Sequence, residues 1–211
     1  MAKTKPFDEH LSRYEQWFVE NHFVFRSELK ALQKAIPGHG RGVEIGAGSG
    51  IFARELGIKE GIEPSYQMRK KAIERGINAI DGVAENLPYP DKSFDFVLMV
   101  TTLCFVDDVI RSFNEVSRIL KNKGKFIIGF VDKNSPVGII YQKNKHKNVF
   151  YKDAYFYNVE EVFEFLKKTG FKIEVTWQTI FRPLNEISKT ETPEKGYGKG
   201  SFVVVKVSFD M

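Results

Sequence analysis

The sequence predicts an α/β protein with a doubly wound, mostly parallel sheet of seven strands. Short apolar segments alternate with amphipathic helical segments along most of the chain. A glycine-rich turn, "GAGSG", follows the first apolar segment, as in sheets that bind ligands at their strand ends. The last two predicted strands have no helical segment between them, which predicts an antiparallel strand near the C-terminus.

The expected elements alternate in the order that this fold class requires. Residues 8–36 form a helical region, which Pro37 and Gly38 end. Seven strands are predicted over 42–46, 58–63, 77–81, 94–100, 125–131, 171–177 and 202–209. Helices are predicted over 50–56, 66–75, 109–120 and 159–168. The segment 94–100, "FDFVLMV", is almost wholly apolar, which is typical of a central strand buried on both faces.

The chain of 211 residues is expected to be one domain over 1–211. Residues 137–158 fit neither a helical nor a strand pattern and are crowded with tyrosine and phenylalanine. Long irregular segments in compact domains are often lids, so we expect an insertion there that covers a site.

The composition limits the cellular compartments and the classes of binding partner that we expect. No apolar segment is long enough to span a bilayer, no secretory signal is evident, and the single cysteine, Cys104, cannot form an internal disulfide. We therefore expect a cytoplasmic protein with no membrane partner. The net charge is +5, but most lysines alternate with acids, which argues against a nucleic-acid partner. The four histidines lie far apart, so no metal site is expected.

The spacing of the glycine-rich turn indicates which ligand it binds. A dinucleotide fingerprint, G-x-G-x-x-G, would need glycine at Ile51, and a phosphate-binding loop would need Gly-Lys-Ser/Thr. Glu44 precedes the turn and favours a cationic ligand group. Glu63 follows Gly46 by 17 residues at the end of the second strand, where a carboxylate can accept both hydroxyls of a ribose. A ribose with a cationic part and no phosphate describes S-adenosylmethionine; a nicotinamide-dependent oxidoreductase is the least supported reading.

Four motifs in this order resemble the class I S-adenosylmethionine-dependent methyltransferases. They are "VEIGAGSG" (43–50), "GIEPS" (61–65), "DGVAENLPYPDKSFDFVLMV" (81–100) and "NEVSRILKNKGKFIIG" (114–129). The likeness is strongest to the type 11 group, which contains ubiquinone/menaquinone-biosynthesis-like enzymes, and it covers roughly residues 40–130. The resemblance implies a Rossmann-like methyltransferase fold and S-adenosylmethionine as the cofactor.

The resemblance also implies the cofactor-binding residues. Glu44 would orient the amino group of the cofactor, Glu63 would hold the ribose, and Thr101 and Thr102 would lie near the donor methyl. The full set is Glu44, Gly46, Ala47, Gly48, Glu63, Pro64, Met68, Val83, Ala84, Glu85, Thr101 and Thr102. Many relatives carry a histidine shortly after the fourth strand, where this chain has Phe105. No catalytic base can therefore be named.

The acceptor is expected to be a small molecule in an apolar or aromatic pocket. The N-terminal helical region and the insertion supply its candidate residues, which are Tyr14, Trp17, Phe105, Tyr141 and Tyr155. The stretch after the fourth strand, "TTLC", lacks the Pro-Pro motif of adenine-N6 DNA methyltransferases. Two alternatives stay open: an RNA or protein acceptor, using the lysine clusters at 121–125 and 143–147, or a non-catalytic S-adenosylmethionine-binding protein. Cys104 and His146 are expected to be a core residue and a surface residue.

Overall fold

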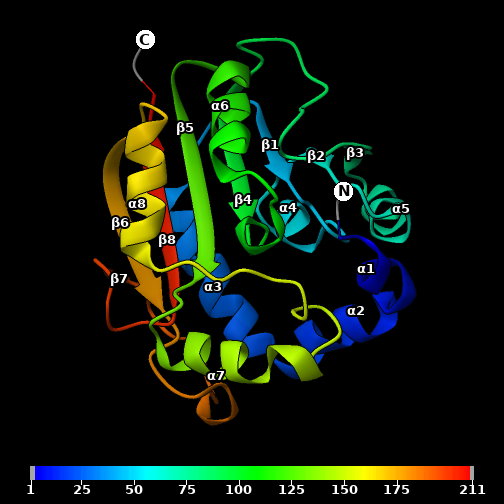
Figure 1. Cartoon of the computed structure of the whole chain (residues 1–211), viewed down its shortest axis with the longest axis vertical. Coiled ribbons are helices and arrows are strands. Elements are labelled where there is room, and N and C mark those ends of the chain that lie inside the picture. The colour runs from blue at the N-terminus through cyan, green and yellow to red at the C-terminus, as the bar shows by residue number, and fades with distance from the viewer. Residues whose placement is uncertain (1–2, 210–211) are drawn as a thin grey trace.

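The computed structural model describes residues 3–209, which fold around one mixed sheet (Figure 1). The sheet has eight strands in the order β3-β2-β1-β4-β5-β8-β6-β7. Their bounds are β1 (Gly42–Ile45), β2 (Glu60–Ile62), β3 (Asn78–Ile80), β4 (Phe94–Val100), β5 (Leu120–Val131), β6 (Lys172–Thr179), β7 (Glu194–Lys195) and β8 (Phe202–Ser208). The predicted fold class is confirmed.

The strand directions follow the prediction, with one strand more than expected. Strands β1 to β5 pair in parallel, whereas β8 lies between β5 and β6 and is antiparallel to both. The eighth strand, β7, is only two residues long and pairs Trp177 with Lys195 at the sheet edge. The prediction of seven strands was therefore wrong by this one element, because two residues are too few to produce an alternating pattern.

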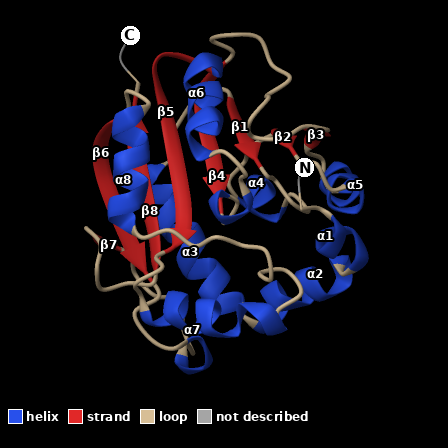
Figure 2. Cartoon of the chain, in the orientation of Figure 1, coloured by secondary structure: helices blue, strands red, loops and turns tan. Residues whose placement is uncertain are grey.

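Helices cover both faces of the sheet (Figure 2). On one face lie α6 (Val109–Ile119) and α8 (Val159–Lys168), whose buried residues share a core cluster with β4, β5 and β8. On the other face lie α3 (His22–Ala35), α4 (Ile51–Glu55) and α5 (Tyr66–Glu74). In β4, Val97 and Met99 join the first cluster and Leu98 and Val100 the second, which explains why this strand is apolar except at the half-buried Asp95.

The N-terminal region forms three helices rather than one continuous helical stretch. They are α1 (Lys5–Glu9), α2 (Leu11–Glu20) and α3, which are separated at His10 and Asn21. The Asn21 side chain donates to the carbonyl of Trp17, 3.0 Å away, and so binds the last turn of α2. These breaks let α1 and α2 lie across the carboxyl ends of the parallel strands while α3 packs on the sheet (Figure 1).

The segment 137–158 is not irregular throughout, contrary to expectation. It begins with helix α7 (Pro136–Asn144), followed by the 3₁₀ turn η2 (Lys145–Lys147), and only the rest lacks regular structure. The Ser135 hydroxyl caps α7 by accepting from the Gly138 amide, and proline occupies the first turn. The helix exposes Ile139 and Ile140, which hides the usual amphipathic pattern. Across residues 3–209, no helix has the length and apolar character needed to cross a bilayer.

Candidate functional site

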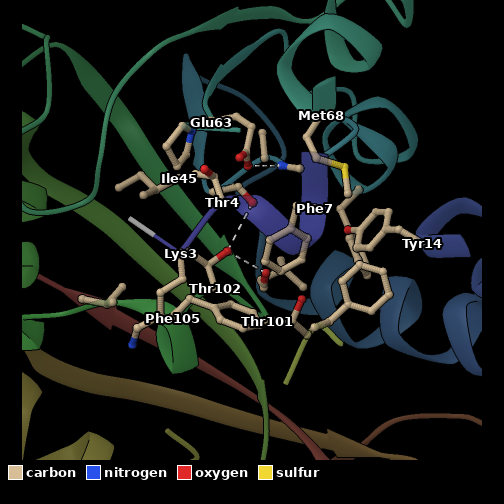
Figure 3. A pocket seen from close by; sticks show the side chains of 18 of the residues that line it. Lys3, Thr4, Phe7, Tyr14, Ile45, Glu63, Met68, Thr101, Thr102 and Phe105 are labelled. Atoms are coloured by element: carbon tan, nitrogen blue, oxygen red, sulfur yellow. Dashed lines mark hydrogen bonds between the residues drawn. The ribbon is translucent and has the colours of Figure 1, made fainter. Parts of the chain in front are cut away.

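A cavity of about 1150 Å³ lies at the carboxyl ends of β1, β2 and β4 (Figure 3). Strand order reverses between β1 and β4, and ligands of doubly wound sheets bind at this reversal. Residues from α1, α2, α3 and α7 complete the wall. All twelve residues that the resemblance assigns to the cofactor line this cavity.

The glycine-rich turn needs glycine for both conformation and space. Gly46, Gly48 and Gly50 have φ angles of 68°, 55° and 77°, in the left-handed region. A Cβ at Gly46 would lie 2.3 Å from the side chain of Thr102, and one at Gly48 would lie 3.1 Å from the hydroxyl of Tyr14. The turn therefore presents bare backbone to the cavity.

Glu63 connects this turn to the end of β2. Its carboxylate accepts from the amide of Gly48 at 2.8 Å and from the amide of Ser65 at 2.7 Å. The side chain is buried, and this burial raises the pKa of Glu63 to about 7 although both backbone hydrogen bonds act to lower it. Arg69 donates to the Glu63 carbonyl at 2.6 Å, and this hydrogen bond stabilises the backbone at the end of β2.

Glu44 is a second buried acid beside the turn. It lies in β1 with 1% of its surface exposed, and it lines the cavity. Its Oε2 is enclosed and has no hydrogen-bond partner among residues 3–209. Burial raises the pKa of Glu44 well above its usual range, and the charge of Glu63 adds to this effect. Glu44 lines the cavity and one of its oxygens has no partner, so its carboxyl group is suited to accept a hydrogen bond from a cationic ligand group.

The remaining cofactor candidates from β2, α5 and the loop after β3 lie on the same side. Met68 is fully buried in α5, whose first turn is capped by the hydroxyl of Ser65. The Glu85 carboxylate already has protein partners, because its Oε1 accepts from the amides of Asp107 and Asp108 at 2.8 and 3.2 Å. Glu85 therefore positions the loop before α6 as well as lining the cavity.

Two threonines end β4. Thr101 has a φ of 49°, which is unusual for a β-branched residue and costs on the order of 1–3 kcal/mol. Its amide donates to the carbonyl of Gly129, 2.8 Å away. The Thr102 hydroxyl lies within hydrogen-bond distance of the carbonyls of Gly46 and Val100. Thr102 thus contacts the glycine turn, and Figure 3 shows both threonines beside Phe7 and Phe105 of the aromatic part of the cavity.

The aromatic part of the cavity contains four of the five acceptor candidates: Tyr14, Trp17, Phe105 and Tyr141. Phe7, Phe150 and Tyr151 line it with them. The ring of Phe7 lies 5.2 Å from that of Phe105 and 5.3 Å from that of Phe150, and Figure 3 shows Phe7 between Tyr14 and Phe105. Helices α1 and α7, which are remote in sequence, thus contribute side chains to the lining of the same pocket.

Tyr155, the fifth candidate, does not line the cavity. Its side chain is 56% exposed, and its ring packs on Tyr157 with the centroids 4.8 Å apart. Its backbone amide donates to the carbonyl of Cys104 at 2.8 Å. The main chain of Tyr155 thus anchors the segment after η2 to the end of β4, while its ring points away from the pocket, and we remove it from the acceptor site.

His146 has its expected surface position, whereas Cys104 is half-buried and lies outside both core clusters of residues 3–209, contrary to expectation. Burial raises the pKa of the Cys104 thiol to about 12, and its sulfur donates to the carbonyl of Thr101 at 3.4 Å. A thiol that stays protonated is a poor nucleophile. His146 is exposed in η2.

The sequence reasoning missed Glu28. This residue lies in α3, is 6% exposed, and lines the aromatic part of the cavity. A signal was present: Glu28 lies three residues after Phe25 and four before Leu32, on the apolar stripe of its helix. An acidic residue on the apolar stripe of a helix is expected to be buried, because that stripe packs against the core.

The N-terminal strap, which we define as residues 3–9, crosses the cavity. Asp8 accepts from the Ser65 hydroxyl at 2.8 Å and from the Gln67 amide at 3.0 Å, next to the end of β2. At its other end, Lys3 lies 3.6 Å from the Asp107 carboxylate and donates to the carbonyl of Asp153 at 3.1 Å. The strap therefore joins the glycine-turn side of the cavity to the segment after α7.

Known proteins share this arrangement over nearly the whole chain. A family model described as "Methyltransferase domain" matches residues 43–128. A Thermotoga maritima structure, described as an S-adenosylmethionine-dependent methyltransferase and possible histamine N-methyltransferase, is 47% identical. The alignment covers 97% of this chain and 98% of that chain, with a TM-score of 0.94. The chain belongs to the class I S-adenosylmethionine-dependent methyltransferases, in the type 11 group.

Two further similar proteins are an archaeal sequence relative and a solved structure. An uncharacterised protein of Methanocaldococcus jannaschii is 44% identical over 199 residues, which are 94% of this chain and 96% of that protein. A chain from the complex of the Haloferax volcanii Trm112 methyltransferase activator with a methyltransferase is 16% identical. It has a TM-score of 0.73 and covers 100% of this chain and 99% of that one, so it shows the fold alone.

The cofactor of this methyltransferase is S-adenosylmethionine, and the residues present fit it. The bare turn lets a ligand approach the backbone of Gly46–Gly48 closely. Glu44, a cavity-lining acid with one unpartnered oxygen, would suit an ammonium group. Phosphates would meet two buried acids here, so a dinucleotide fits less well.

Proposed function

We propose that this methyltransferase transfers its methyl group to a small-molecule acceptor. The observation that carries the proposal is a single cavity with two chemically different halves. The cofactor half is lined by the ends of β1 and β2 and the loop after β3. The acceptor half is lined by aromatic rings from α1, α2, η1 (Leu103–Phe105), α7 and the segment after η2. Pockets for single small ligands span about 300–1,000 Å³, so about 1150 Å³ suits a cofactor and a small acceptor together.

In the cofactor half, we propose roles for residues that line the cavity. Glu63 would accept the ribose hydroxyls and Glu44 the amino group. The backbone of Gly46–Gly48 would line the methionine part. The adenine would lie among apolar neighbours, which are Pro64, Met68, Val83 and Ala84.

S-adenosylmethionine supplies a methyl group on a sulfonium and takes up the bonding electron pair when that group leaves. What the chain contributes is alignment and exclusion of water. Thr101, Thr102 and Tyr14 lie where the two halves meet, so they would align the acceptor with the methyl group. Burial raises the pKa of Tyr14 far above its usual value, so its hydroxyl stays neutral and offers one hydrogen bond rather than a base.

The cover over the cavity favours a small acceptor over RNA or protein. The N-terminal strap and residues 137–158 lie across the acceptor half, and we propose that they form its lid within one domain. The lysine cluster at 121–125 begins β5, whereas Val131, at the other end of that strand, lines the cavity. Lys121 pairs with Asp95 and Lys125 with Glu174. The lone Cys104 also supports a reducing, cytoplasmic setting.

Calorimetry tests the cofactor roles. We expect S-adenosylmethionine and S-adenosylhomocysteine to bind and NAD not to bind. Glu63→Ala should weaken both adenosyl ligands at least about tenfold, because charge-assisted hydrogen bonds are lost. Glu60→Ala is the matched control, since Glu60 begins the same strand and pairs with Arg41 instead. Equal losses in the two variants would refute the role of Glu63.

Transfer of a labelled methyl group tests the acceptor class. Purified enzyme is incubated with labelled S-adenosylmethionine and three separate acceptor mixtures: small amines, phenols and thiols; total tRNA; and denatured cell protein. Histamine belongs in the first mixture because the Thermotoga relative's description names it. Label in the first mixture alone supports the proposal. Label in tRNA or protein alone overturns it, and cofactor binding without transfer to any mixture favours a non-catalytic protein.

A further inference from the structure

The cavity contains one buried acid more than its cofactor half uses. Three carboxylates that line it are buried: Glu28, Glu44 and Glu63. The last two lie beside the glycine turn. Glu28 comes from α3 and lies among the residues of the acceptor half, so the cofactor roles proposed above leave it without a ligand group.

Glu28 also lacks a protein partner. Within residues 3–209 its carboxylate takes part in no hydrogen bond and no ion pair, and burial alone accounts for its raised pKa, about 8. Its oxygens are not sealed in the core, because they are absent from the fully enclosed unpartnered atoms and the residue lines the cavity. Buried carboxyl groups are normally paired, so one that opens into a cavity without a partner needs an explanation.

The surroundings of Glu28 suit a cation. Tyr141 and Tyr151 line the same cavity as Glu28. Burial raises the pKa of both hydroxyls, and the charge of Glu28 adds to this effect. The two rings lie 5.0 Å apart, and Trp17 lines the same half of the cavity. Aromatic faces attract ammonium groups, most strongly where water is excluded. The basic residues of α2 and α6 that line the cavity, Arg13 and Arg111, are exposed.

We propose that Glu28 recognises the acceptor by binding a positively charged nitrogen, so that the substrate is a small organic amine. This inference rests on the proposed function and names the substrate class of the same cavity. The carboxylate and the faces of Tyr141, Tyr151 and Trp17 form the cationic subsite. Glu28 acts here in binding the acceptor and not in the transfer of the methyl group.

The subsite makes binding depend on pH. A cation prefers ionised Glu28, which carries a proton in the empty protein below about pH 8. Affinity for an amine that stays protonated should therefore rise with pH, roughly tenfold per unit up to that value, and then level off. Tyr141 of α7 and Tyr151 of the segment after η2 line the cavity with Glu28, and with their raised pKa they stay neutral over this range. Arg13 and Glu20 of α2 line the cavity from exposed positions. Glu44 and Glu63 border the same cavity, so each pH value is compared with a Glu28 variant.

The test is a titration of the protein saturated with S-adenosylhomocysteine. The probes are phenethylamine, which is cationic, and 2-phenylethanol, its neutral counterpart. Wild type should bind the amine at least about tenfold more tightly than the alcohol at pH 8, and Glu28→Gln should remove this preference and its pH dependence. Glu164→Gln, which changes an exposed acid of α8, should leave both unchanged.

The outcomes separate this inference from the proposed function. If Glu28→Gln keeps the wild-type preference for the amine, or wild type shows none, Glu28 is not the cation site, although S-adenosylhomocysteine still binds. If S-adenosylhomocysteine does not bind wild type, the proposed function fails, and titration of the free protein still decides the role of Glu28. Equal binding of S-adenosylhomocysteine to both proteins and an unreduced melting temperature show that the variant is folded.

Discussion

The two halves of the cavity are built in different ways. The cofactor half is built around backbone, namely the Gly46–Gly48 turn and the ends of two neighbouring strands, and the Glu63 side chain holds it through the amides of Gly48 and Ser65. The acceptor half consists of side chains from α1, α2, α3, α7 and the segment after η2. Backbone geometry tolerates few substitutions, whereas a wall of side chains can be rebuilt one residue at a time. One fold can therefore keep its cofactor while its acceptor changes.

The largest effect should follow from adding one methyl group to the cofactor half. In Gly46→Ala, the new Cβ would lie 2.3 Å from Thr102 at a φ of 68°. The turn must move, and displacement by about 1 Å of groups that position a ligand costs about 100-fold. We expect a loss of that size in affinity for S-adenosylhomocysteine, measured by calorimetry.

Gly57→Ala is the control for this variant. Gly57 has a φ of 74°, so it carries the same backbone penalty of about 1 kcal/mol, but a Cβ there meets nothing within 4 Å. Its affinity for S-adenosylhomocysteine should stay that of wild type. If both variants lose affinity equally, general destabilisation rather than the shape of the turn decides binding.

The same contrast explains what the sequence could predict. The cofactor half is local in sequence: a strand, a glycine turn, and acids at Glu44 and Glu63 occur in an order that few other sites share. The acceptor half depends on which distant segments meet. Nothing in the sequence indicates that Phe7 contacts Phe150, or that the ring of Tyr151 faces inward while that of Tyr155 faces solvent.

The second prediction concerns stability in the acceptor half. The pKa of Glu28 is about 8 in the folded protein and near 4.3 when unfolded. This raised pKa costs nothing below the unfolded value, and stability is lost as pH rises from there to about 8. Glu28→Gln should therefore stabilise the ligand-free protein by on the order of 5 kcal/mol at pH 9 and little at pH 4.

Thermal melts of both proteins over this pH range check the prediction. The expected gain corresponds to a melting temperature higher by roughly 10–20 °C at pH 9. Glu164→Gln should shift the melting temperature by the same small amount at both ends of the range. A gain for Glu28→Gln that is equal at pH 4 and pH 9 would mean that the acid is neutral throughout, or that the change repacks α3.

A third, smaller effect concerns the strap that joins the two halves. Asp8→Ala removes the contacts with Ser65 and Gln67 and frees the strap at the cofactor side. We expect S-adenosylhomocysteine to dissociate about threefold to tenfold faster, with little change in melting temperature. Stopped-flow dissociation measures this rate. Glu9→Ala is the control, because Glu9 is exposed and its ion pair, at 3.8 Å, is with Lys5 within α1. An unchanged rate in Asp8→Ala would show that the strap does not cover the cofactor.

The smallest effect should come from the exposed tyrosine of the lid. Tyr155 and Tyr151 are four residues apart, but only Tyr151 lines the acceptor half. Tyr155→Leu removes an exposed ring that packs on Tyr157. The backbone amide that anchors the segment to Cys104 is kept. We therefore expect kcat/KM for an acceptor amine to change less than about twofold. Tyr151→Leu removes a ring and a hydroxyl beside Glu28 and should lower kcat/KM about tenfold, while the affinity for S-adenosylmethionine stays constant. A matched loss in both variants would mean that the segment acts through its fold alone. A loss confined to Tyr151→Leu would show that acceptor choice depends on which rings of one short segment face inward.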